Sequence, residues 1–437
     1  MHPTTHRKIG WVSAGSIVVA NMVGTGAFTT LGLQLQHIHS TWAILSLWVF
    51  GGVIALLGAV SYAELGARMP RSGGEYYYLS QIYHPLAGYL SGWISLTVGF
   101  TASIALSAMA MGAYLSEVVG TDARWIALAI IVLVSGIHSF HVEQSSRFQN
   151  IFTILKLALM VFLALACFVH SAPINGLAWS GPWLFELGTV PYAVALVFVV
   201  YAYSGWNAAA YITGEVRQPA RNLPRALVGG ALLVSVLYVL LQMGFLYQAG
   251  REALAGKIEV AQIAAVSVFG ASGGQTVSLL IGLLLVSSIS AMVWVGPRVS
   301  RAMAEDYPVW YFLARDNRHG VPVNAIWFQA AVSIFLLLSG SFEQVLTYSG
   351  FVLHLSTTAA VAGLFFLRRK DKGRRPPFAS PFYPWAQIIF LLFSVWMLAF
   401  LLYDKPRESL LGLLNLAIGS VSYWWNKRYA LPPVKGK

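Results

Sequence analysis

The fold of this chain depends on Val23-Gly24-Thr25-Gly26-Ala27-Phe28, at the centre of the first apolar segment. That segment, residues 11–31, is long enough for a membrane-crossing helix, because the hydrocarbon core needs about 20 apolar residues. Gly24 and Gly26 interrupt it, and each glycine costs a helix interior about 1 kcal/mol relative to Ala. Two interpretations are open. Either small residues here let neighbouring helices pack closely, or the helix unwinds and its freed amides bind an anion.

Composition places the chain among polytopic helical membrane proteins. Its mean hydropathy is +0.67, and 57% of its 437 residues are hydrophobic against 10% charged. Soluble domains carry about 25% charged residues. The single cysteine, Cys167, excludes an intramolecular disulfide framework and a thiolate metal cluster. The first apolar run is too long for a cleavable signal and is followed by further spans.

Hydropathy and charge together predict twelve spans with both termini in the cytoplasm. Of the 28 Lys and Arg residues, 22 fall on the side of the N-terminus, five on the other side, and Lys156 within a span. The 16 acidic residues divide evenly, so the bias is the one that the positive-inside rule requires. The net charge of +12 therefore reflects topology and contact with anionic lipid rather than nucleic acid. The predicted spans are residues 11–31, 42–63, 84–116, 125–140, 150–169, 188–213, 226–248, 274–296, 324–339, 345–367, 384–402 and 408–425.

A second interruption lies near the midpoint of the sixth span. Ser204-Gly205 stands there among large aromatic residues that would otherwise pack as one continuous helix. Spans one and six occupy corresponding positions if the first ten spans form two halves of five. Because five is odd, the second half would enter the membrane from the opposite side. Paired interruptions in corresponding spans indicate a transporter's midplane site, which favours the binding interpretation of the first break.

The two breaks suit a zwitterion. An unwound turn at Ser204-Gly205 frees carbonyl oxygens, which accept from an ammonium group, whereas the break at Gly24 and Gly26 frees amides for a carboxylate. A carboxylate and an ammonium group a few ångströms apart describe an α-amino acid. We therefore expect a single membrane transporter domain over residues 1–437, with repeats at 11–169 and 188–367 and two extra helices at 384–425.

Three motifs resemble the amino acid–polyamine–organocation superfamily, and the last of them is close to its L-type amino acid transporter branch. The resemblance covers most of the chain in order and spacing. It implies an all-α fold of two inverted five-helix repeats with helices one and six broken, plus two further helices, and alternating access around an amino acid. The motifs are Gly24-Thr25-Gly26-Ala27-Phe28, then Tyr62-Ala63-Glu64-Leu65 with Pro70-Arg71-Ser72-Gly73-Gly74-Glu75-Tyr76, and Tyr201-Ala202-Tyr203-Ser204-Gly205-Trp206-Asn207, continuing to Arg221-Asn222-Leu223-Pro224-Arg225-Ala226.

The same resemblance implies roles for the residues of both breaks. The amides around Thr25 and Gly26 would hold the substrate carboxylate, and the carbonyls of Tyr201, Ala202 and Ser204 its amino group. Tyr201 and Trp206 would act as gating residues, although the branch usually has Phe or Trp where Tyr201 stands. The substrate-binding residues predicted in the two breaks are Val23, Gly24, Thr25, Gly26, Tyr201, Ala202, Tyr203, Ser204, Gly205 and Asn207.

Two departures from the family pattern qualify these expectations. Ala27 stands where relatives usually have Ile or Val, which predicts a looser floor to the site. The cysteine that tethers animal relatives to an accessory subunit is missing from residues 117–124. No disulfide-linked partner is therefore expected.

Lys156 is the one Lys or Arg predicted inside a span. Burying such a charge costs about 2.5–3.5 kcal/mol on insertion scales, so a functional role is the first hypothesis. A structural lysine that snorkels to the interface is the alternative. The resemblance implies that this lysine takes the place of a sodium ion between helices one and eight, and Ser288 is the hydroxyl expected to pair with it. That favours sodium-independent transport, with proton coupling as the alternative.

The absence of acidic residues from the spans favours uncharged substrates. A cationic side chain would need a carboxylate partner at the midplane, and Asn207 stands where a Glu would meet that need. Gly99, Ser103 and Met292 are candidates to face the substrate side chain, with ordinary packing as the alternative. His354 is interpreted as a hydrogen-bonded packing histidine.

These features predict a secondary transporter of neutral L-amino acids in a bacterial-type inner membrane, working by exchange or facilitated diffusion. The alternative within transport is a proton-coupled symporter. A membrane-embedded lipid-modifying enzyme is disfavoured, because the spans lack paired carboxylates or His–acid pairs. No metal-binding histidine spacing and no phosphate-binding loop occur, so no catalytic residue, metal or cofactor is expected.

Overall fold

The computed structural model describes residues 9–140, 146–170, 183–318, 320–371 and 376–429, and the regular structure of these residues is helical. Apolar side chains fill its core because each long helix is apolar over most of its length. The helices are α1 (Trp11–Met22), α2 (Gly26–Gln34), α3 (Thr41–Arg68), α4 (Gly74–Ile82), α5 (Pro85–Ile94), α6 (Phe100–Val119), α7 (Ala123–Phe140), α8 (Ser146–Val169), α9 (Trp183–Glu186), α10 (Val190–Ala202), α11 (Pro219–Leu254), α12 (Val260–Asp306), α13 (Val323–Ser339), α14 (Phe342–Lys370), α15 (Trp385–Asp404) and α16 (Pro406–Tyr429), with a π-helix η1 (Ser95–Gly99) and 3₁₀ helices η2 (Ala208–Glu215) and η3 (Pro308–Ala314).

Eight of the described helices are long and apolar enough to cross a membrane, and the bent pair α1–α2 makes nine. The sequence-based prediction of a polytopic helical membrane protein is therefore confirmed. Each of the twelve predicted spans also overlaps a helix, the remaining three being the α10–η2 pair, α13 and α16. The arrangement as twelve crossings in two inverted repeats stays a prediction.

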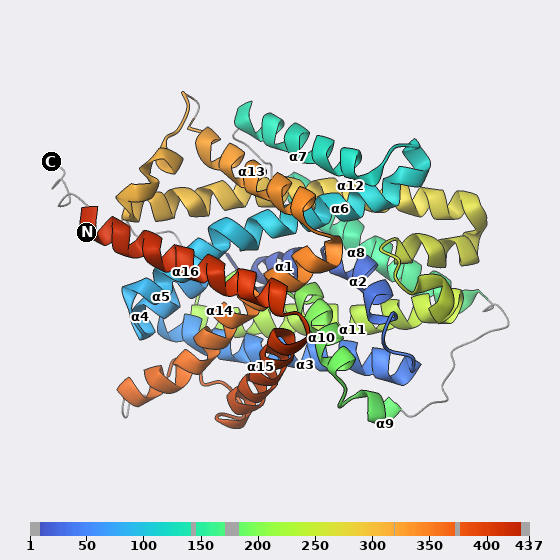
Figure 1. Cartoon of the computed structure of the whole chain (residues 1–437). Helices are drawn as coiled ribbons and strands as arrows, with labels where there is room; N and C mark the ends of the chain where they lie inside the picture. Colours follow the sequence, from blue (N-terminus) through green and yellow to red (C-terminus); the bar gives the residue numbers. More distant parts are fainter. Residues whose placement is uncertain (1–8, 141–145, 171–182, 319, 372–375, 430–437) are drawn as a thin grey trace.

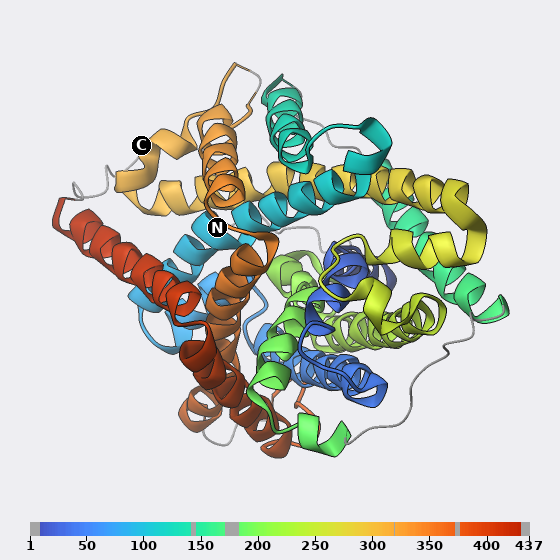
Figure 2. The ribbon, with the colours of Figure 1, turned by 45° about the vertical axis from the view of Figure 1, so that its right-hand side comes forward.

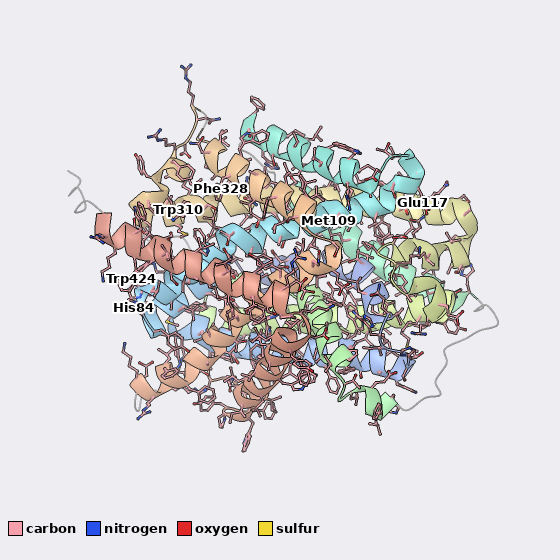
Figure 3. All side chains as sticks on the ribbon, in the orientation of Figure 1. His84, Met109, Glu117, Trp310, Phe328 and Trp424 are labelled. Carbon is pink, nitrogen blue, oxygen red and sulfur yellow. The ribbon has the colours of Figure 1, made fainter. Side chains whose placement is uncertain are left out.

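The helices form two groups with the broken helices between them. Figures 1 and 2 show α6, α7, α12 and α13 on one side and α3 and α11 on the other, with α1, α2 and α10 between the groups. The helices α4 and α5 and the C-terminal end of α16 lie at the same end of the molecule (Figure 1). We call this end the inner face and the opposite end the outer face. His84 and Trp424 lie toward the inner face and Glu117 toward the outer face (Figure 3).

A buried carboxylate ties three helices together at the inner face. Glu64 of α3 is fully buried, and Arg368 of α14 binds both of its oxygens, at 2.8 and 2.6 Å. Arg68 donates to the same carboxylate at 2.8 Å, and so does the Ser380 amide, five residues before α15, at 2.7 Å. Charge-assisted hydrogen bonds of this kind are among the strongest in proteins. They fix the inner ends of α3, α14 and α15 relative to one another.

Candidate site at the two broken helices

The first apolar segment is interrupted as the sequence predicts. α1 ends at Met22, α2 begins at Gly26, and the two axes are bent by 41°. The first amides of a helix have no partner within it. Among the described residues, no hydrogen bond is found for the amides of Thr25, Gly26 and Ala27. The start of α2 therefore presents three free donors at a buried position, since Thr25 is 5% exposed.

The sixth span is interrupted where Ser204-Gly205 was expected to break it. α10 ends at Ala202, residues 203–207 form turns, and the 3₁₀ helix η2 begins at Ala208. Gly205 adopts a φ of +100°, a conformation that side-chain-bearing residues rarely take. This glycine therefore enables the chain to leave the α-helix at this point.

The two breaks are in direct contact with each other. A Cβ atom on Gly26 would lie 2.5 Å from the Cα of Ala202, and one on Gly205 would lie 2.7 Å from the backbone of Asn21. Glycine is needed at both crossings because the backbones approach more closely than a methyl group permits. The predicted binding residues of the two breaks are thus brought together in space.

The carbonyl groups of the second break differ from one another in their partners. The Tyr201 carbonyl accepts from the Ser204 amide at 2.9 Å, and the Ala202 carbonyl lies 3.2 Å from the Tyr238 hydroxyl. Among the described residues, no hydrogen bond is found for the Ser204 carbonyl. Of the three carbonyls expected to bind an ammonium group, that of Ser204 is therefore the most available.

Two polar residues of α11 support the breaks and were not identified from the sequence. The Tyr238 hydroxyl donates to the Met22 carbonyl at 2.6 Å, and the Gln242 amide donates to the Ala27 carbonyl at 2.8 Å. Both side chains are buried. They stand four residues apart in an apolar span, which places them on one helix face. That spacing was the signal available in the sequence.

The side-chain candidates from the third span lie beside a π-helix. Ser103 interacts with the Tyr201 hydroxyl and donates to the Gly99 carbonyl at 2.7 Å. Gly99 closes η1, and π-bulges occur frequently at functional sites. Met292 lies one turn beyond Ser288 on α12, and its carbonyl accepts from Gln329 of α13 at 3.1 Å. The structure thus joins Ser103 to the second break, whereas the Met292 carbonyl contacts α13.

The two remaining candidates, Trp206 of the second break and His354 of α14, pack against other helices. Trp206 is buried and packs edge-on against Tyr62 of α3, with ring centroids 4.9 Å apart. His354 Nε2 lies 2.9 Å from the Ser394 hydroxyl in a buried position. The prediction of a hydrogen-bonded packing histidine is therefore confirmed, while the gating role of Trp206 stays a prediction.

Lys156 is buried in α8 and contacts α12. Its side chain is 7% exposed, and its Nζ donates to the Ser288 hydroxyl at 2.6 Å. The two residues named together from the sequence are therefore in contact. Their part in coupling stays a prediction.

A carboxylate that sequence reasoning did not place at the site lies against the second break. Glu75 of α4 accepts from Asn207 Nδ2 at 3.0 Å. The spans predicted from the sequence contain no acid, but Glu75 lies between the second and third of them, at the start of α4. Its position was not evident from the sequence because the contact joins residues 132 positions apart.

Comparison with known proteins decides the family. A family model described as amino acid permease matches residues 9–422. The chain belongs to the amino acid permease family. The sequence-based assignment to the amino acid–polyamine–organocation superfamily, close to the L-type branch, is thereby confirmed.

Curated relatives of this permease are named as amino acid exchangers and transporters. It is 27% identical to the serine/threonine exchanger SteT of Bacillus subtilis, over 97% of this chain and 98% of that protein. It is 27% identical to the mouse Asc-type amino acid transporter 1, over 94% of this chain and 80% of that protein. It is 28% identical to the human large neutral amino acids transporter small subunit 2, over 96% of this chain and 80% of that protein.

Tyr114 of α6 joins α2 to the start of α12 on the side of the permease that faces the outer end. Its buried hydroxyl donates to the Phe28 carbonyl at 2.7 Å and accepts from the Ala261 amide at 3.2 Å. The Gly256 amide also donates to the Gly32 carbonyl at 2.8 Å. The helix that begins at Val260 thus contacts α2 through Tyr114.

We expect Tyr114→Phe to loosen this outer contact. The change leaves the buried Ala261 amide without its partner and removes one of the bonds to the Phe28 carbonyl, at a cost of about 1–3 kcal/mol. Amide hydrogen exchange in residues 26–34 and 260–266 should accelerate about tenfold or more, since each 1.4 kcal/mol is a factor of ten. Tyr247→Phe, whose ring packs on Phe168, is the control and should leave exchange unchanged. Equal exchange in the two variants would contradict a joining role for the Tyr114 hydroxyl.

Proposed function

We propose that this permease carries neutral L-α-amino acids by sodium-independent exchange or facilitated alternating access. The observation that carries the proposal is the contact between the two breaks, one with free amides at Thr25, Gly26 and Ala27 and the other with a free carbonyl at Ser204. Amides bind a carboxylate and carbonyls bind an ammonium group. The names of the relatives, which include a serine/threonine exchanger and neutral amino acid transporters, agree with this substrate class.

Sodium independence is supported by the position of Lys156. A buried ammonium group supplies one fixed positive charge, and its contact with Ser288 joins α8 to α12. We propose that the Lys156 ammonium group takes the place of a bound sodium ion. We also propose that the protein lies in an inner membrane with both termini in the cytoplasm. The inner face is then the cytoplasmic face. No disulfide-linked subunit is proposed, because the single cysteine, Cys167, is buried beside Gly244.

Counterflow of radiolabelled amino acids in proteoliposomes tests the proposal. We expect neutral L-amino acids to be exchanged at equal rates in sodium and in choline, with no acidification of the lumen. The same amino acids should raise the melting temperature, because a ligand at 100 times its Kd stabilises by about 2.7 kcal/mol. Transport that requires sodium would contradict the mechanism, and substrate-driven acidification would favour the proton-coupled alternative. Absence of both transport and protection across the panel would contradict the substrate class.

A further inference from the structure

Glu75 occupies a buried position among four donor groups that come from three helices and one break. The Tyr62 hydroxyl donates to its Oε1 at 2.5 Å and Asn207 Nδ2 at 3.0 Å. The Thr357 hydroxyl, whose proton is shared with the Leu353 carbonyl at 3.1 Å, lies 3.3 Å from the same oxygen. The Tyr211 hydroxyl donates to its Oε2 at 3.1 Å. The side chain is 6% exposed. One carboxylate therefore joins α3, the second break, η2 and α14.

This carboxylate differs from the other deeply buried one in having neutral partners. Glu64 is paired with Arg68 and Arg368. Within the described part of the chain, no Lys, Arg or His nitrogen lies within ion-pair distance of Glu75. The pKa of the Glu75 carboxyl is raised, because the effect of burial exceeds the lowering by its four hydrogen bonds. Its buried state thus depends on all four donors staying in place.

The chain before Glu75 is shaped to bring it against η2. Gly73 and Gly74 adopt φ values of +129° and +53°, which favour glycine. The Gly73 amide donates to the Tyr211 carbonyl at 3.0 Å, and the Gly214 amide donates to the Ser72 hydroxyl at 3.1 Å. A Cβ atom on Gly74 would lie 2.5 Å from the Tyr211 ring. Residues 72–75 therefore wrap around Tyr211 and bind η2 through backbone and side chain together.

We propose that Glu75 is a positioning residue that holds η2 against α3 and α14 and so keeps the inner side of the site closed. Asn207 is the last residue of the break, and its contact with Glu75 links the site directly to the inner face. Movement of η2 away from α14 would separate the Tyr211 and Thr357 hydroxyl groups, which both contact the Glu75 carboxylate. Loss of the carboxylate thus favours the conformation that is open to the inner face. The transport consequences rest on the proposed function, whereas the local closure does not.

The first experiment measures amide hydrogen exchange in the substrate-free protein. Glu75→Gln keeps the size of the side chain but removes its charge and one acceptor oxygen. Exchange should accelerate about tenfold in residues 72–75 and 208–215, and stay unchanged in residues 26–34 at the outer side. Tyr211→Phe, which removes one donor, should give a smaller acceleration in the same segments. The control is Glu343→Gln, which removes a partly exposed carboxylate paired with Lys405. Unchanged exchange at η2, or equal acceleration in all segments, would overturn the proposal.

The second experiment measures KM for substrate on each side of oriented proteoliposomes. Apparent affinity scales with the population of the competent conformation. Glu75→Gln should therefore raise the ratio of outer to inner KM about fivefold or more, and Glu343→Gln should leave it unchanged. A lower maximal rate with both KM values unchanged would indicate a merely structural carboxylate and overturn the proposal. If the wild-type protein moves no amino acid, the proposed function fails, and hydrogen exchange alone decides the role of Glu75.

Discussion

Gly26→Ala should abolish most transport while Gly15→Ala in the same broken helix is tolerated. The added methyl group at residue 26 would lie 2.5 Å from both the Cα and the Cβ of Ala202. At Gly15 the nearest atom, on Ala226, is 3.8 Å away, which is ordinary contact. Overpacking of a dense interior typically costs about 1–3 kcal/mol. If that cost falls on the conformation in which the breaks meet, exchange slows by about tenfold or more.

Exchange in proteoliposomes, normalised to folded protein, measures this effect. Ala202→Gly in the Gly26→Ala background removes one of the two clashing atoms and should restore part of the activity. Two changes at contacting sites are expected to be non-additive. Purely additive losses would show that Gly26 is required for its own backbone flexibility, and not for the approach of the two breaks.

The breaks themselves were predictable from the sequence because their cause is local. Gly24 and Gly26 lack the helix propensity that an uninterrupted span needs, and Gly205 permits a positive φ. Lys156 was recognisable for a similar reason, since one cation in an apolar run has a cost that calls for a role. These signals lie within a few residues of the features they predict.

The groups that join the helices around the site were not predictable, because their partners are distant in sequence. Tyr114 contacts residues 86 and 147 positions away, and Glu75 meets Thr357 across 282 positions. A tyrosine in an apolar span or an acid after two glycines has many possible partners in an unfolded chain. Only the packed arrangement of α3, α6, α12 and α14 selects among them.

The interpretation of the substrate site changes in one respect. The sequence favoured uncharged substrates because the predicted spans contain no acid, yet Glu75 at the start of α4 binds Asn207. Its four hydrogen bonds already use the carboxylate within the protein. A cationic substrate group would have to displace those donors, so the preference for neutral amino acids is retained for a different physical reason.

Lys156→Met should slow transport without lowering stability. Methionine keeps an unbranched, flexible side chain but carries no charge. A buried charge costs about 2.5–3.5 kcal/mol on insertion scales, and replacing buried ionic groups with apolar ones is often neutral or stabilising. The melting temperature in detergent should therefore stay the same or rise. Exchange should fall by about tenfold or more, since removing an interaction of a charged group costs about 1.5–3 kcal/mol.

Ser288→Ala and Ser287→Ala form a matched pair that isolates the contact to the lysine. Ser288 accepts from Lys156 at 2.6 Å, whereas the buried hydroxyl of Ser287 has no hydrogen-bond partner among the described residues. Ser288→Ala should therefore impair exchange, and Ser287→Ala should leave both exchange and stability close to wild type. A lysine that only stabilises the fold predicts the reverse for Lys156→Met, a lower melting temperature with normal exchange per folded molecule. The opposite directions of these two outcomes separate a charge that serves transport from one that serves folding.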